Sequence, residues 1–398
     1  MFDNNLIPPE QHGFLKGRSV TSNLIGALEI ITTLAEKSVP ADTICFDFRK
    51  AFDKVLRSIL LSKLKKLNCP EFLISWITSF LSDRSMSVLI GNCKSSPVPT
   101  PSGVPQGSVL GPTLFLVMIA DLPSFCQTDG VHCFLFADDV KIVGSDPACL
   151  QSFIDKLVVW SRENCLPIAP DKCSVTHFLP HLNPKQQYFF DGTAIPSTSG
   201  PVRDLGVMVS SDLSWDEHIK VCTRKAYSAL YCLLKAIKSN NPTVLTRLYT
   251  VYVRPLLEFA SPVFNPTLKR QAKELEKIQK LATRRIFFRS PLLRNYLSSF
   301  HYSDRLKVLN LESLSARRKR FDLKYFHQAL VGLTPRNFEI NVRKSITRGS
   351  SMKVFVPGYK SKYKRSFFSY RAARFFTKLP RSVQSISKHK AFVASLLV

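Results

Sequence analysis

The first half of the chain mixes helical and strand-like patterns of apolar residues. Positions three to four apart are apolar in four segments, which predicts amphipathic helices at 20–38, 57–68, 71–82 and 146–164. Shorter apolar runs predict a buried strand at 43–48, a strand at 86–92, and two apolar strand segments on either side of an Ala-Asp-Asp turn within 132–144. The stretch that begins at Gly111 predicts a buried helix with Pro112 in its first turn, and 95–107 predicts a loop.

The pattern changes after about residue 201. The segment 201–209 predicts one more strand, and helical periods with basic outer faces follow at 215–238, 242–258, 268–288 and 301–332. Residues 333–398 are rich in Pro, Ser, Lys and aromatic residues and show no clean period. Strands and helices that do not alternate strictly predict an α+β architecture.

The composition is typical of a folded chain with two or three domains. Of the 398 residues, 45% are apolar, which excludes a disordered chain and allows a sizeable core. Because no apolar run reaches about eighteen residues, we expect no membrane span, and the first residues lack the pattern of a secretory signal. Ten cysteines without a Cys-x-x-Cys pair predict reduced thiols in an intracellular protein, in the nucleus or the cytoplasm.

Positive charge is concentrated in the second half of the chain. Residues 1–200 carry 17 Lys and Arg against 18 Asp and Glu, whereas residues 201–398 carry 39 against 11. A single basic run is often only a solvated tail, but a net charge of +27 gathered in an apolar-rich half indicates a polyanionic partner, with nucleic acid as the default. The first half can therefore hold chemistry while the second holds a phosphate backbone.

Three carboxylates lie where buried strands end. Asp47 follows the apolar run TICF, and Asp138 and Asp139 occupy the turn between CFLF and VKIV. Each alone is compatible with an ordinary polar residue at a strand end or a surface turn. Together, carboxylates between apolar strands are costly unless cations neutralise them. Nucleotidyl transfer uses two divalent cations held by a few carboxylates on a rigid support, and this arrangement would supply them.

Three strings in order resemble the palm motifs of reverse transcriptases from non-LTR, jockey-like retrotransposons. They are FDFRKAFDKV at 46–55, SGVPQGSVLGPTLF at 102–115 and FADDV at 136–140. The resemblance implies a right-hand polymerase with a ferredoxin-like palm, partial fingers, and a helical, basic thumb and C-terminal region. It implies partial fingers at 1–40, a palm at 41–200, a primer grip and thumb at 201–300, and a basic region at 301–398.

The same resemblance implies roles for single residues. Asp47, Asp138, Asp139 and Phe48 would line a site for two Mg²⁺ ions, with Mn²⁺ as a possible substitute. Phe52 would exclude a ribose 2′-hydroxyl, or would be a core residue; Gln106 and Gly107 would lie under the incoming nucleotide. The other implied positions are Lys172 as a proton donor near the pyrophosphate, Lys16 and Arg18 as phosphate contacts, and Leu205 and Gly206 in the primer grip.

The sequence favours an RNA-directed DNA polymerase of a mobile element, with an RNA template, a DNA primer, their hybrid and dNTPs as partners. The family pattern begins earlier than this chain, so we expect the chain to be N-terminally truncated and to lack finger strands and an endonuclease. An inactive nucleic-acid-binding remnant of a retroelement is the alternative, and a group II intron maturase is a third interpretation. The sequence leaves the oligomeric state open.

Overall fold

The computed structural model describes residues 6–266, 268–344, 352–356 and 358–396. Its contacts form two compact units, each with its own core. The first comprises residues up to Asn23 and Val39–Ser199, and the second comprises Leu24–Ser38 and the residues from Gly200 onward. Helix α1 (Val20–Glu36) therefore begins in the first unit and continues in the second.

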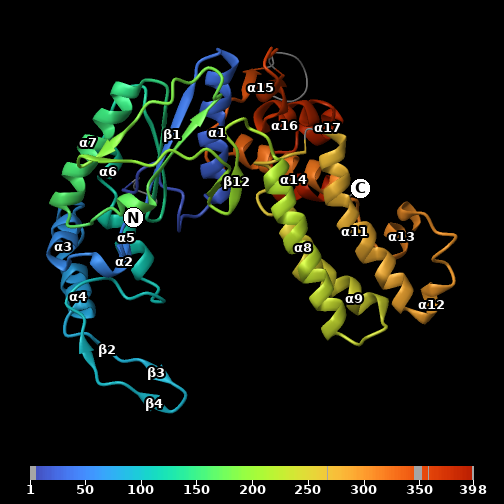
Figure 1. Ribbon diagram of the computed structural model, residues 1–398, viewed down its shortest axis with the longest axis horizontal. Helices are drawn as coiled ribbons and strands as arrows, with labels where there is room; N and C mark the ends of the chain where they lie inside the picture. The colour runs from blue at the N-terminus through green and yellow to red at the C-terminus, as the bar shows by residue number, and fades with distance from the viewer. Residues whose placement is uncertain (1–5, 267, 345–351, 357, 397–398) are drawn as a thin grey trace. The chain divides into compact units, whose positions relative to one another are not determined.

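A four-stranded antiparallel sheet organises the first unit (Figure 1). Its strands are β1 (Ala41–Phe46), β6 (His132–Phe136), β7 (Asp139–Gly144) and β8 (Ser174–Phe178). Their spatial order is β6-β7-β1-β8, with every neighbouring pair antiparallel. Counted along the chain, the second and third strands form a hairpin and the first strand lies between the third and the fourth. This is the strand order of the ferredoxin-like fold, which confirms the predicted sheet.

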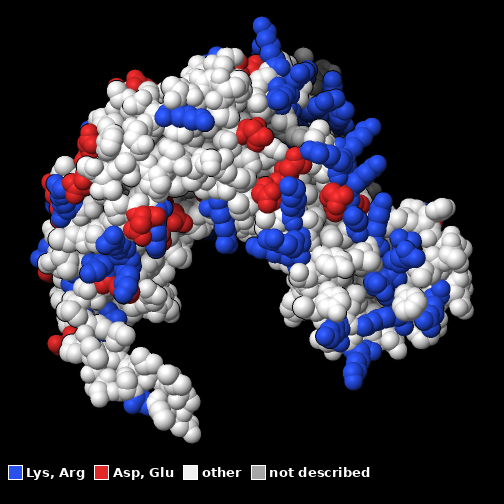
Figure 2. Space-filling model, viewed as in Figure 1, with Lys and Arg blue, Asp and Glu red and all other residues white. Residues whose placement is uncertain are grey.

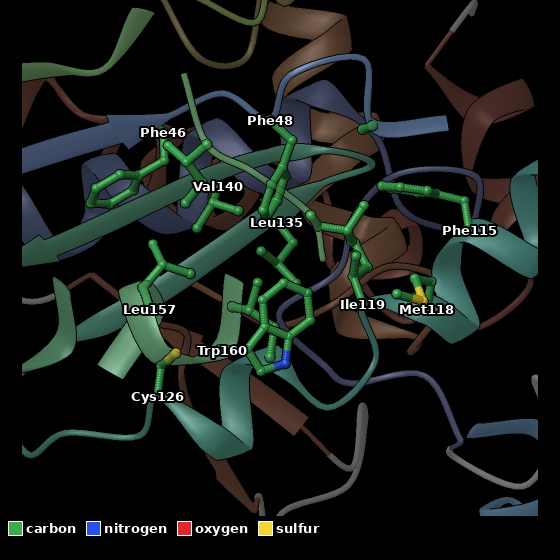
Figure 3. Packing of buried hydrophobic residues seen from close by; sticks show 14 of the residues in the cluster. Phe46, Phe48, Phe115, Met118, Ile119, Cys126, Leu135, Val140, Leu157 and Trp160 are labelled. Atoms are coloured by element: carbon green, nitrogen blue, oxygen red, sulfur yellow. The ribbon is translucent and has the colours of Figure 1, made fainter. Parts of the chain in front are cut away.

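Helices fill both crossovers of this sheet. They are α2 (Ala51–Lys54), α3 (Arg57–Lys66), α4 (Glu71–Leu81), α5 (Gly111–Met118), α6 (Leu122–Phe125), α7 (Pro147–Glu163) and the 3₁₀ turn η2 (Pro170–Lys172). Figure 3 shows how Phe48 and Leu135 pack with Leu157 and Trp160 of α7 in the core. Each such buried side chain contributes about 1.5–3 kcal/mol, so this core holds the ends of β1, β6 and β7 in fixed positions.

Helix α7 begins at a side-chain cap. The Asp146 carboxylate accepts hydrogen bonds from the backbone N–H groups of Ala148, at 2.8 Å, and Cys149, at 3.4 Å. We expect Asp146→Ala to lower the free energy of unfolding by about 1 kcal/mol, because two N–H groups lose their acceptor. Chemical denaturation measures this change. Glu163→Ala removes the same charge from the exposed last turn of the helix and should leave stability within about 0.5 kcal/mol.

The segment 85–99 differs from its prediction. The single strand predicted at 86–92 is interrupted, because the chain forms an exposed hairpin that turns at Gly91, and the predicted loop at 95–107 contains one two-residue strand of that hairpin. Its paired strands are β2 (Ser85–Met86), β3 (Leu89–Ile90), β4 (Cys93–Lys94) and β5 (Val98–Pro99). A further small hairpin joins β9 (Phe189–Phe190) and β10 (Thr193–Ala194).

The second unit starts with a hairpin and is otherwise mostly helical. The hairpin joins β11 (Val202–Asp204) to β12 (Val207–Val209), so the single strand predicted at 201–209 is two strands. Helices α8 (Asp216–Ala236) and α11 (Lys269–Arg289) lie side by side (Figure 1). Between them in sequence are α9 (Pro242–Leu248), the π-helical turn η3 (Tyr249–Val253) and α10 (Arg254–Glu258).

The C-terminal part of this unit forms its own aromatic core. Its elements are α12 (Pro291–Arg294), α13 (Tyr302–Val308), α14 (Leu314–Leu330), β13 (Asn341–Lys344), β14 (Met352–Phe355), α15 (Lys362–Ser366), α16 (Phe368–Thr377), α17 (Arg381–Gln384) and α18 (His389–Ser395). Phe326, Phe368 and Phe392 are fully buried there. Arg371 donates two hydrogen bonds to the buried Asp322 carboxylate, which joins α16 to α14.

The α1 residues of the second unit are attached to it by buried polar contacts. The Lys364 ammonium lies 2.6 Å from the Glu29 carboxylate and also donates to the Thr33 hydroxyl. Glu36 accepts hydrogen bonds from the backbone N–H groups of Lys360 and Ser361. Among the helices that the structure describes, none is both long and apolar enough to cross a membrane.

Candidate active site

The ends of the central strands bring the predicted carboxylates to one place. In the β1–β7 ladder Phe46 pairs with Val140, so Asp47 leaves β1 level with the start of β7. Phe136 pairs with Asp139 across the two-residue turn that contains Asp138. Asp47 and Asp138 are half-buried, whereas Asp139 is exposed. The sequence prediction that these strand ends meet is therefore matched by the geometry.

Asp47 lies beside the positively charged side chain of Lys172. The Lys172 ammonium lies 3.1 Å from Asp47 Oδ2, and their side chains are 57% and 34% exposed. The hydrogen bond to Asp47 raises the pKa of Lys172, so this lysine is protonated at neutral pH. The backbone of Asp47 accepts a hydrogen bond from the Ala169 N–H, which ties the strand end to the segment that leads into η2. Lys172 is therefore held beside the carboxylates.

Asp138 lies in a setting that disfavours its negative charge. Burial raises the pKa of its carboxyl group, and the negative charge of Asp47 raises it further. The Lys172 cation acts in the opposite direction. A divalent cation would stabilise the charged form of Asp138, whose ionisation is disfavoured by burial and by the neighbouring carboxylate of Asp47.

The carboxylate oxygens here fit a hard cation such as Mg²⁺, for which water molecules and the substrate supply most of the ligands. Within the described ranges, no three His, Cys, Asp or Glu side chains are gathered as a complete metal cage. Magnesium in phosphoryl-transfer enzymes is bound by one or two carboxylates and by substrate phosphates. Asp47 and Asp138 match this requirement, and Asp139 follows Asp138 in the sequence with an exposed side chain. Phe48 can contribute only its backbone carbonyl, because its ring carries no oxygen donor; the ring is buried against Trp160.

Backbone hydrogen bonds join the first motif string, at 46–55, to the second, at 102–115. The backbone N–H of Gly103 donates to Val55 at 2.8 Å, and the N–H of Val104 donates to Phe52 at 2.9 Å. A Cβ atom on Gly103 would lie 2.9 Å from the Asp53 Cα, so only glycine fits this contact. The two strings therefore pack without a side chain between them.

The predicted nucleotide-binding residues lie on this surface. The half-buried ring of Phe52 stacks on Phe115, with ring centroids 4.4 Å apart. The exposed Gln106 amide donates to the Asp53 carboxylate at 3.2 Å. Gly107 has φ +86°, and a Cβ atom there would meet no atom within 4 Å, so the backbone faces open space. The structure thus leaves room above Gly107 for a ligand.

The remaining predicted positions are more separate. Lys16 is exposed, whereas the Nη1 atom of Arg18 donates to the backbone carbonyls of Pro8, Pro9 and Gln11. A phosphate contact by Arg18 would therefore use its other nitrogen atoms. In the second unit, Leu205 and Gly206 form the two-residue turn between β11 and β12, with φ values of +44° and +90°.

The family model for reverse transcriptase (RNA-dependent DNA polymerase) matches residues 1–209, which is more than half of the chain. The chain belongs to the reverse transcriptase family. Reverse transcriptases use divalent metal ions, in agreement with the carboxylate pair. All three motif strings lie inside the matched segment.

Relatives of this reverse transcriptase come from mobile elements. It is 27% identical over 301 residues to a probable RNA-directed DNA polymerase from transposon BS of Drosophila melanogaster, covering 72% of this chain and 33% of that protein. It is also 27% identical to an RNA-directed DNA polymerase from mobile element jockey of Drosophila funebris, covering 70% and 32%. The predicted resemblance to jockey-like polymerases is confirmed, and the chain spans about a third of the length of these relatives.

A solved structure of apo telomerase from Candida Tropicalis is similar to this reverse transcriptase with a TM-score of 0.41 and 14% identity, covering 98% of this chain and 57% of that one. This likeness is too weak to refine the fold.

Two residues of this reverse transcriptase were missed from the sequence. Asp53 binds Gln106, and it lies within the first motif string, where its spacing from Asp47 gave no reason to single it out. Gln11 is buried and bonded to the backbone of Ala137. Its only signal was its position in QHGFLKGRSV, the segment that resembles a finger segment of the family.

Proposed function

We propose that this chain forms the core of an RNA-directed DNA polymerase that extends a DNA primer on an RNA template with dNTPs. The observation that carries the proposal is the pair of half-buried carboxylates, Asp47 and Asp138, at the ends of adjacent strands, where burial and the charge of Asp47 raise the pKa of Asp138. Such a pair is suited to hold cations at a reacting phosphate. The family match and the mobile-element relatives support the same activity.

Asp47 and Asp138 would hold two Mg²⁺ ions, for which Mn²⁺ could substitute, and Asp139 would support them. When bound, such ions activate the attacking hydroxyl group and stabilise the charge on the leaving phosphate. The two aspartates would orient the primer end and the triphosphate against each other. Burial of Asp138 strengthens each of these electrostatic contacts by keeping water away.

Lys172 and Phe52 would act on the incoming nucleotide. Lys172 is protonated, with its Nζ atom already among the carboxylates, so it can donate a proton to the leaving pyrophosphate. The Phe52 ring, fixed by stacking on Phe115, would occupy the space that a ribose 2′-hydroxyl needs. The open backbone at Gly107 would allow a base or sugar to approach closely.

The second unit offers a basic surface for a nucleic-acid backbone. The stretch 218–257 contains seven Lys and Arg residues, and the stretch 277–303 contains six. Neither stretch contains Asp or Glu. Between α8 and α11 a groove of about 450 Å³ is lined by Tyr227, Tyr231, Arg285 and Phe288, among others. The blue Lys and Arg side chains over this part of the unit are visible in Figure 2. We propose that this surface holds the RNA–DNA hybrid through its phosphates.

Primer extension tests the proposal directly. Purified protein given poly-rA, oligo-dT, labelled dTTP and Mg²⁺ should incorporate label, and the product should be absent when the metal is chelated or poly-rA is omitted. A sample that binds the template–primer but incorporates nothing with Mg²⁺ or Mn²⁺ would contradict a polymerase activity of this chain.

A nucleic-acid-binding remnant is the second candidate, favoured by the stretches 218–257 and 277–303 of the second unit, which contain Lys and Arg but no Asp or Glu. The two candidates differ in one outcome. A remnant binds hybrid with a steep salt dependence, since phosphate contacts release counterions, and shows no incorporation. A polymerase shows both.

Arg285 provides a prediction for the groove. Arg285→Ala should weaken hybrid binding and make the slope of log K against log salt shallower by about one, because one phosphate contact is lost. Filter binding at several salt concentrations measures the slope. Arg162→Ala removes another exposed arginine, which pairs with Asp191 in the first unit, and is the control for the loss of one positive charge. An unchanged slope for Arg285→Ala would exclude its contact with a phosphate.

A further inference from the structure

The turn that carries Asp138 has an unusual backbone. Ala137 joins β6 to the catalytic aspartate with φ +54°, in the left-handed region that residues other than glycine, Asn and Asp rarely adopt. A conformation of this kind persists only where neighbouring groups hold it. The neighbours of Ala137 therefore control where the Asp138 carboxylate lies.

Gln11 is the group that holds this turn. Its side chain is 1% exposed, and its amide pairs with both backbone groups of one residue. The Ala137 N–H donates to Gln11 Oε1 at 2.9 Å, and Gln11 Nε2 donates to the Ala137 carbonyl at 3.3 Å. Gln11 Oε1 also accepts from the Gly13 N–H at 2.7 Å. The Gln11 side chain therefore satisfies the backbone N–H and carbonyl of Ala137, which a neighbouring strand would satisfy if Ala137 lay inside the sheet.

The segment around Gln11 is itself fixed against the sheet. The Leu135 N–H donates to the Glu10 carbonyl at 2.9 Å, and the His12 N–H donates to the Leu135 carbonyl at 2.8 Å, so the segment extends the sheet beside β6. Arg18 donates to the Gln11 carbonyl from the other side. A Cβ atom on Gly13 would lie 2.4 Å from the Ala137 nitrogen, so the close approach requires glycine. Gln11 thus reaches the turn from a rigid base.

We propose that Gln11 is a positioning residue of the metal site, which sets the orientation of Asp138 by clamping the backbone of Ala137. This inference rests on the proposed function for its consequence in catalysis, but its geometry does not. Gln11 touches neither substrate nor cation in this arrangement; it acts through the turn. Loss of the clamp should weaken cation binding and slow the chemical step together.

Gln11→Met keeps the size of the side chain and removes all three hydrogen bonds. We expect it to weaken Mn²⁺ binding, titrated by electron paramagnetic resonance of free Mn²⁺, by about tenfold, as for other residues that orient metal ligands. The Mg²⁺ concentration that gives half-maximal incorporation of dTTP should rise and kcat should fall, with less change in the KM for dTTP. Asp138→Asn gives the reference for a lost site.

Two further variants separate positioning from general stability. Gln151→Met is the matched control, because Gln151 also pairs with both backbone groups of one residue, Phe189, but away from the carboxylates. It should leave the Mn²⁺ affinity unchanged. Ala137→Gly relieves the strained φ, so adding it to Gln11→Met should recover part of the lost affinity.

The outcomes are distinct. An unchanged Mn²⁺ affinity in folded Gln11→Met, or an equal loss in Gln151→Met, would overturn the positioning role. If Ala137→Gly gives no recovery, the loss does not act through the turn, and the inference also fails. Mn²⁺ titration needs no polymerisation, so a wild-type protein without incorporation would count against the proposed function while the clamp is still tested.

Discussion

Asp138→Asn is expected to lower the rate of dTTP incorporation on poly-rA and oligo-dT by about 10³-fold or more. A bound cation supplies several kcal/mol of transition-state stabilisation, and each loss of about 1.4 kcal/mol is a factor of ten in rate. Asparagine keeps the shape of the side chain but loses the charge that holds the cation. Single-turnover extension with a preformed template–primer complex measures the chemical step alone.

Stability provides a check that the loss is chemical. Burial and Asp47 raise the pKa of Asp138 in the folded chain, so its ionisation lowers folding stability as the pH rises above the ordinary aspartate value. A neutral asparagine does not ionise and so avoids this loss of stability. We therefore expect the melting temperature of the Asp138→Asn protein at neutral pH to equal or exceed that of the wild type. Asp129→Asn, at an exposed turn before β6, should leave both rate and stability unchanged. A variant at position 138 with more than a tenth of wild-type activity would refute the metal-ligand assignment.

Phe52→Val is expected to reduce discrimination against ribonucleotides by about 10²-fold. Rejection by a fixed side chain depends on a steric contact that a smaller residue does not make, and a loss of about 2–3 kcal/mol corresponds to this factor. The quantity to measure is the ratio of kcat/KM for dTTP to that for rUTP or rTTP. This ratio does not depend on the fraction of folded protein, so it separates selectivity from stability.

Phe115→Leu is the matched control for Phe52. Phe115 is fully buried and stacks on Phe52, so its replacement loosens the same ring pair without opening space at the nucleotide surface. We expect it to lower stability and to change the selectivity ratio by less than Phe52→Val does. If both variants destabilise the fold and neither changes the ratio, Phe52 is a core residue and not a sugar gate.

The pattern of apolar residues predicted β1, β6 and β7 well, because each is a buried apolar run that ends or begins next to an aspartate. The runs before Asp47 and around Asp138 correspond to β1, β6 and β7 within two residues. The strand order did not follow from the pattern; it followed from the resemblance to polymerases. Patterning alone cannot show which strands are neighbours, since pairing depends on contacts distant in sequence.

Other elements were not predicted correctly, because the pattern of apolar residues in them does not reflect their burial, their helix type or their short length. The apolar residues of β3 mimic a buried strand, yet Leu89 and Ile90 are 67% and 76% exposed. The helical period of 242–258 matches the combined bounds of α9, η3 and α10, but it did not predict that η3 is a π-helical turn. After residue 333 the helices have ten residues or fewer, too short to establish a period.

The candidate site was predictable where side chains carry the chemistry and not where the backbone does. Asp47, Asp138 and Lys172 are polar residues at strand ends or in a loop, and the structure brings them together. Gln11 bonds to a peptide group more than a hundred residues away, and apart from its place in a segment that resembles a finger segment, its sequence neighbours do not distinguish it from a surface glutamine.

The exposed hairpin of β2–β5 has a practical consequence for handling the protein. Its side chains Leu89 and Ile90 are exposed, which leaves apolar surface available for intermolecular contact. We therefore expect concentrated preparations to associate through this ribbon. A lysine in place of Ile90 would blunt the edge at a point remote from the carboxylates and favour well-behaved samples for crystallisation or cryo-microscopy.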